Sequence, residues 1–131
     1  MKEYISRNGV LARKIEQADM GEGLSFFSDA PDTIQVGTWV YPEGKELAPH
    51  IHKAVPRQFE RTAEVLVVMK GKILASIYDE DKNYAGDWEI SAGEILVALR
   101  GGHGYTVLEP SIVYEIKTGP YPGADADRER I

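Results

Sequence analysis

The stretch EVLVVMKGKILASIYD, residues 64–79, contains two apolar runs joined by Lys70-Gly71. Each run is long enough for a strand, and Gly71 can supply the positive φ that a tight turn requires. The stretch therefore predicts an antiparallel hairpin. Strand alternation puts Glu64, Leu66 and Val68 on one face, so a carboxylate would enter an otherwise apolar interior, where an unpaired charge is costly.

Short apolar runs bounded by turn residues continue on both sides of this stretch. Residues 10–18 are ambiguous, because their spacing fits a short helix and a poorly formed strand equally well. No long helical pattern separates the strands, which indicates an all-β antiparallel sandwich or barrel. The expected strands are 24–27, 33–41, 84–90, 94–99, 105–108 and 112–118.

Composition limits the classes of protein and site. The chain has 131 residues, a formal net charge of −6 and no cysteine. This length suits a single domain, and the acidic balance opposes nucleic-acid binding. The chain contains no apolar run of membrane-spanning length and begins without the apolar core of a signal peptide, so we expect a cytoplasmic protein without membrane contact. Any metal must be held by nitrogen and oxygen ligands.

The sequence His50-Ile51-His52 is the strongest indication of a metal site. Residues two apart on a strand project to the same side, so the two imidazoles would share one space. Glu64 and His103 could complete a set of three nitrogens and one oxygen, which suits a divalent transition metal. Glu60 is a substitute for Glu64 as the carboxylate ligand.

The order of these residues resembles a known motif. Gly44, His50, His52, Glu64 and Gly71 follow the first motif of the cupins, with a longer interval between His52 and Glu64. The segments Gly86-Asp87, Ala92-Gly93-Glu94 and Gly101-Gly102-His103 follow the second motif more loosely, because Leu99 replaces its proline and Val107 its asparagine. The chain thus resembles a small single-domain cupin of the metal-binding type over about residues 34–118.

The resemblance implies a double-stranded β-helix, the jelly-roll barrel of the cupins, over residues 34–118. Residues 1–33 would be an N-terminal extension packed on the barrel, and residues 119–131 a polar C-terminal tail. The ligands of one divalent metal, which could be Fe, Mn, Zn or Ni, would be His50, His52, Glu64 and His103. Small cupins commonly form dimers, so we expect a homodimer.

Residues near the expected site suggest how it would meet a small-molecule ligand. Lys53, Arg57 and Arg61 lie on the insertion before Glu64 and could pair with an anionic substrate. Tyr105 should share the face of His103 and could act as a catalytic acid or hydrogen-bond donor.

Three functions are compatible with this sequence. The first is a metal-dependent enzyme that acts on a small polar or anionic metabolite by oxygenation, isomerisation or hydrolysis. The second is a binding or sensing module that holds a metal or metabolite without transforming it. The third is a metal-free sugar-nucleotide epimerase or isomerase, in which a histidine is the base beside an acid.

Overall fold

The computed structural model describes residues 1–131 and is an all-β structure. Neither of its two short helical segments has the length and apolar character of a membrane-spanning helix. The segments are η1 (Gln17–Asp19) and α1 (Ala124–Asp127). The strands are β1 (Lys2–Ser6), β2 (Gly9–Ile15), β3 (Gly23–Phe26), β4 (Gly37–Val40), β5 (Glu64–Lys70), β6 (Lys72–Tyr78), β7 (Tyr84–Ser91), β8 (Ile95–Ala98), β9 (Gly102–Val107) and β10 (Ile112–Lys117).

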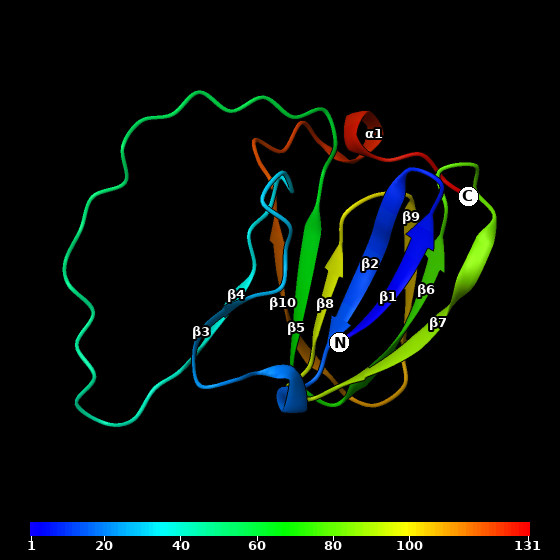
Figure 1. The fold of residues 1–131 in the computed structure, drawn as a ribbon. Coiled ribbons are helices and arrows are strands. Elements are labelled where there is room, and N and C mark those ends of the chain that lie inside the picture. Colours follow the sequence, from blue (N-terminus) through cyan, green and yellow to red (C-terminus); the bar gives the residue numbers. More distant parts are fainter.

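The strands form three antiparallel sheets (Figure 1). The largest has the order β1-β2-β8-β5-β10, the second has the order β7-β6-β9, and β3 pairs with β4 alone. The predicted all-β class is therefore confirmed. The sheets do not close into a barrel, so the double-stranded β-helix remains a prediction.

The predicted hairpin between β5 and β6 is wrong. β5 pairs with β8 and β10, whereas β6 pairs with β7 and β9, so the two strands belong to different sheets. Gly71 does have the expected positive φ, at 78°. Its turn carries the chain from one sheet to the other instead of folding it back on the same sheet.

The main core lies between the two larger sheets. Leu66 and Leu96 of the five-stranded sheet join Ile73 and Ile77 of the three-stranded sheet in one buried cluster. A second cluster on the opposite face of β5 and β8 contains Val65 and Val97, together with Ile15 and Val36. β5 and β8 are thus buried on both faces, which accounts for their nearly continuous apolar sequences.

The ambiguous N-terminal region forms strands, because β2 pairs with both β1 and β8. Arg13 on β2 is only 5% exposed and binds Oε1 of Glu3 at 2.7 Å and Oδ2 of Asp29 at 2.6 Å. Burial opposes its charge, but the hydrogen bonds to Asp29 and Glu3 outweigh burial and raise the pKa of Arg13. Arg13 also donates to the carbonyl of Phe27 at 2.9 Å. This side chain therefore ties the segment before β4 to the large sheet.

Residues 41–63 form a long arc outside the sheets (Figure 1). No strand or helix lies between β4 and β5, so the prediction that His50 and His52 lie on a strand is wrong for this structure. Hydrogen bonds within residues 42–61 join positions at most three apart. Pro42, Pro49 and Pro56 each remove a backbone donor, which disfavours pairing of this segment in a sheet.

Candidate functional site

A polar cavity of about 1250 Å³ lies where β5 begins and β10 ends. Its walls come from the start of β5, from β9, from the end of β10 and from the C-terminal tail. The side chains that carry acid–base chemistry are Glu64, His103, Tyr105, Glu115 and Lys117. The fold thus gathers on one cavity residues that lie up to 53 positions apart in the chain.

Glu64 is the centre of this group. Its side chain is 8% exposed, and its Oε1 accepts a 3.0 Å hydrogen bond from the hydroxyl of Tyr105. Nε2 of His103 lies 3.6 Å from the same oxygen, and Nζ of Lys117 lies 3.6 Å from Oε2. Both carboxylate oxygens therefore have protein partners, which offsets the cost of burying the charge.

His103 and Tyr105 extend from β9 toward the interior, as the alternation of a strand requires. They pair with Ile77 and Ala75 of β6, both of which belong to the main core. Their rings stack with centroids 5.2 Å apart. Although Tyr105 as a residue is 38% exposed, burial around its hydroxyl and the charge of Glu64 raise the pKa of Tyr105 far above its ordinary value. Its hydroxyl is therefore a persistent hydrogen-bond donor.

Lys117 was not anticipated from the sequence. It is the cross-strand partner of Glu64 in the β5–β10 pair, and its ammonium also forms an ion pair with Glu115. The same ammonium lies 5.4 Å from the ring centre of Tyr121. The hydrogen bond to Glu115 raises the pKa of Lys117. Glu115 and Lys117 lie two apart on β10 and so share a face, and the register with β5 brings this face to Glu64.

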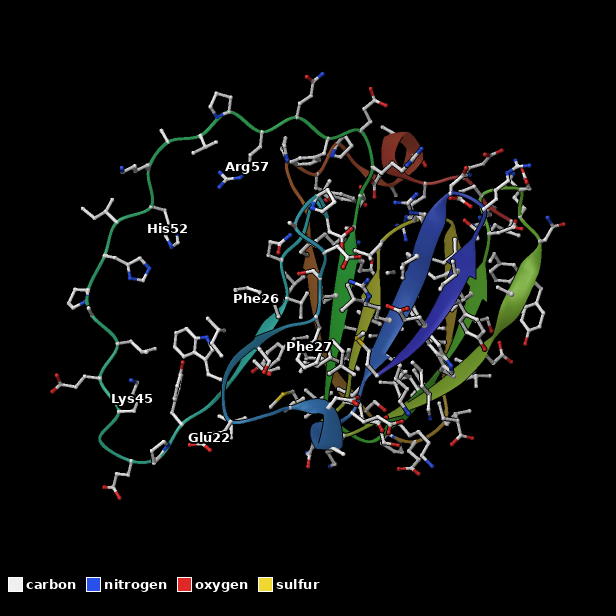
Figure 2. All side chains as sticks on the ribbon, viewed as in Figure 1. Glu22, Phe26, Phe27, Lys45, His52 and Arg57 are labelled. Atoms are coloured by element: carbon white, nitrogen blue, oxygen red, sulfur yellow. The ribbon has the colours of Figure 1, made fainter.

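The structure separates the four expected metal ligands into two pairs. Glu64 and His103 line the cavity, whereas His50 and His52 are exposed on the arc, with ring centres 5.0 Å apart. Figure 2 shows His52 on the part of the arc that lies well away from the sheets. No group of three or more His, Asp or Glu side chains is assembled in a geometry that could hold a metal ion.

The residues expected to bind substrate are also divided. Arg61 lines the cavity, whereas Lys53 and Arg57 do not. Figure 2 shows Arg57 on the arc. Glu60, the substitute carboxylate ligand, also lines the cavity. Arg57 donates only to the nearby carbonyl of Val55, at 3.5 Å. In this structure, Arg61 alone of the three expected cations could contact a molecule in the cavity.

These features define an all-β protein with antiparallel sheets and a carboxylate–imidazole–phenol–ammonium cluster in a polar cavity. Such a cluster can exchange protons with a ligand and can offer one oxygen and one nitrogen to a cation. The chain matches no family model, and comparisons with curated proteins and with solved structures gave no significant match.

Proposed function

We propose that this protein is a metal-binding, cupin-like protein that acts on a small polar or anionic metabolite in the cavity beside Glu64. The observation that carries the proposal is the pairing of a nearly buried carboxylate with an imidazole 3.6 Å away on the cavity wall. Glu64 and His103 fit half of a nitrogen–oxygen ligand set for a divalent transition metal. Their positions on the paired strands β5 and β9 give that half a fixed geometry.

The other half of the ligand set would come from the arc. Residues 59–62 at the end of the arc already line the cavity, and Ala63 is anchored to Thr118, so the rest of the arc would fold toward the cavity from this fixed end. Ordering its backbone costs on the order of 1–2 kcal/mol per residue. Structural zinc sites contribute about 10–16 kcal/mol, enough to order the few residues around His50 and His52. Their ring centres lie 5.0 Å apart, with the ring planes at 74° to each other.

The residues of the chain have distinct roles in this proposal. A bound metal would polarise an oxygen of the metabolite or activate a water molecule. Tyr105 holds Oε1 of Glu64 through its hydroxyl and thereby orients the carboxylate. Arg61 at the cavity wall pairs with an anionic group of the metabolite. The same site without turnover would serve as a sensing module, and a homodimer is proposed for either role.

A second function is favoured by the cluster itself. His103 and Tyr105 are stacked beside each other in the cavity without any contribution from the arc. An imidazole base next to a protonated phenol is the arrangement that a metal-free epimerase or isomerase uses. This alternative requires neither His50 nor His52.

Metal analysis of protein purified without added metal separates the two functions. We expect about one equivalent of a divalent transition metal in the purified protein and a loss of most of it in Glu64→Gln. Glu129→Gln is the matched control, because Glu129 also lines the cavity but its side chain is 82% exposed and paired with Lys82, so the metal content should be unchanged. His50→Ala should lose metal while its folding is preserved. Protein that neither contains nor takes up metal would overturn the first function and favour the second.

A further inference from the structure

We propose that the C-terminal tail, residues 119–131, is a strap that Lys82 holds over the cavity and that limits access to Glu64 and His103. Figure 1 shows the tail leaving the end of β10, passing through α1 and crossing the ends of the strands toward the turn between β6 and β7. Residues 124–131 all line the cavity. A strap of this kind would control the entry of any ligand, with or without a bound metal.

The first part of the strap is anchored beside the five-stranded sheet. The backbone amide of Thr118 donates to the carbonyl of Ala63 at 3.1 Å, directly before the tail begins. The hydroxyl of Thr62 donates to Oδ1 of Asp127 at 2.5 Å, at the end of α1. Because Thr62 and Ala63 directly precede β5, these bonds fix the strap at its start and at α1.

The last part of the strap reaches the three-stranded sheet through contacts that can open. Nζ of Lys82 lies 3.0 Å from Oε1 of Glu129 and 3.5 Å from the carbonyl oxygen of Arg130. The Lys82 and Glu129 side chains are 46% and 82% exposed, so solvent screens their attraction and the pair is weak. The side chain of Ile131 lies so close to Gly102 of β9 that a Cβ on this glycine would collide with it. This end of the strap is therefore held in place but can be released.

The backbone at Lys82 gives independent support. Its φ of 67° makes Lys82 the only residue other than glycine with a positive φ. Glycine and asparagine adopt this conformation readily, whereas the Cβ of a lysine disfavours it. The Lys82 ammonium has no ion-pair or hydrogen-bond partner outside the strap. The contact with the strap thus supplies a reason for lysine at a position that otherwise favours glycine.

The strap restricts access to the acid–base cluster when it is held by Lys82. The side chains of His103 and Glu64 are then 31% and 8% exposed. Release of residues 128–131 would remove part of the cavity wall and expose His103 further. A closed strap limits the water that reaches the buried carboxylate, whereas an open strap admits a ligand.

Lys82→Gly tests the strap in the full-length protein. It removes the ammonium and suits the positive φ, so folding should be preserved. We expect diethyl pyrocarbonate to modify His103 about two- to threefold faster than in wild type, as measured by peptide mass spectrometry, because an imidazole that is 31% exposed becomes more accessible. Trypsin should also cleave faster after Arg128. The exposed His50 and His52 are internal references and should react at unchanged rates.

Lys45→Gly is the matched control. It removes the same charge by the same substitution at a residue that Figure 2 shows on the arc, and Lys45 does not line the cavity. The rates at His103 and Arg128 in this variant should equal those of wild type. Faster modification of His103 in both variants would indicate a general effect of net charge and overturn the role of Lys82.

Two further results would contradict the strap. If Lys82→Gly leaves both rates unchanged, Lys82 does not hold the tail. If trypsin cleaves faster after Arg128 while His103 reacts at the wild-type rate, the tail moves without covering the cavity. Lys82→Asn, which also tolerates a positive φ, gives the same comparison if the glycine variant does not fold. None of these measurements requires a metal, so they remain decisive even if the proposed metal site is overturned.

Discussion

The hydroxyl of Tyr105 donates a 3.0 Å hydrogen bond to Oε1 of Glu64 and so joins β9 of the three-stranded sheet to β5 of the five-stranded sheet. The two residues are 41 positions apart in the chain. The bond therefore fixes the spacing of the two sheets at the cavity in addition to orienting the carboxylate.

Tyr105→Phe tests this link. The ring is kept, but Glu64 loses a donor, and a hydrogen bond to a charged group contributes about 1.5–3 kcal/mol. Because His103 and Lys117 remain near the carboxylate, we expect a loss of about 1–2 kcal/mol in the free energy of unfolding, measured by urea denaturation at pH 7. Tyr114→Phe, at a residue that is 60% exposed, should change it by less than about 0.5 kcal/mol. Equal effects of the two substitutions would contradict the link.

Arg13→Ala should be among the most destabilising substitutions in the chain. The substitution would leave the carboxylates of Glu3 and Asp29 without the guanidinium that binds both of them. The Arg13 side chain is 6% exposed, but those of Asp29 and Glu3 are 63% and 28% exposed, so the remaining carboxylates are partly solvated and the cost should be about 2–3 kcal/mol. The Arg7 side chain is 76% exposed and pairs with Asp81, so Arg7→Ala should cost at most about 1 kcal/mol. Chemical denaturation of the two variants side by side distinguishes these values.

Gly71→Ala and Gly44→Ala separate backbone strain from steric conflict. The two glycines have similar positive φ values, 78° and 81°, so an alanine at either position costs about 1–2 kcal/mol. A Cβ on Gly71 would also lie 2.5 Å from the carbonyl oxygen of Pro110, whereas a Cβ on Gly44 would meet no atom within 4 Å. We expect Gly71→Ala to cost about 1–3 kcal/mol more than Gly44→Ala in urea denaturation. Equal costs would show that the β5–β6 turn does not pack against Pro110.

Asp79 should make stability depend on acid pH. Hydrogen bonds from the side chain and backbone of Asn83 lower the pKa of Asp79 below its ordinary value of 3.8. A carboxyl whose pKa is lowered on folding contributes stability above the ordinary pKa and loses it as the pH falls through the lower, folded value. The melting temperature of Asp79→Ala should therefore be below that of wild type at pH 6–7, and the difference should shrink below about pH 3.8.

The control for Asp79 is Glu22→Ala, which removes an exposed carboxylate outside the sheets (Figure 2). Its melting temperature should follow that of wild type across the same pH range. A difference between Asp79→Ala and wild type that persists undiminished in acid would assign the effect to packing and not to the charge.

Alternation predicted the parts of the fold that depend on a single strand. It located β7 and β10 nearly to the residue and put Glu64 on the same face as Leu66 and Val68, as observed. It could not choose the partners of β5, because a strand buried on both faces has no polar side to show its orientation. It was ambiguous for β2, where the charges of Arg13 and Lys14 interrupt the apolar pattern although both residues are buried through carboxylate partners.

The sequence could indicate which residues belong to the candidate site, because their types suit its chemistry, but it could not indicate all of their contacts. His103, Tyr105 and Glu64 share the cavity, and each was selected from the sequence. The contact of Lys117 with Glu64 depends on the register between β5 and β10, which no local pattern encodes. His50 and His52 lie on a proline-interrupted arc in this structure, so their expected place beside His103 remains a prediction.

The pairing of β5 has a consequence for how the chain acquires its structure. β5 lies between residues 95–98 of β8 and residues 112–117 of β10, so neither neighbour is available until most of the polypeptide has been made. Pairings of such high contact order typically give folding times of milliseconds to seconds. During synthesis, the apolar sequence of β5 would thus emerge unpartnered, and its shielding until β10 follows would be a task for chaperones.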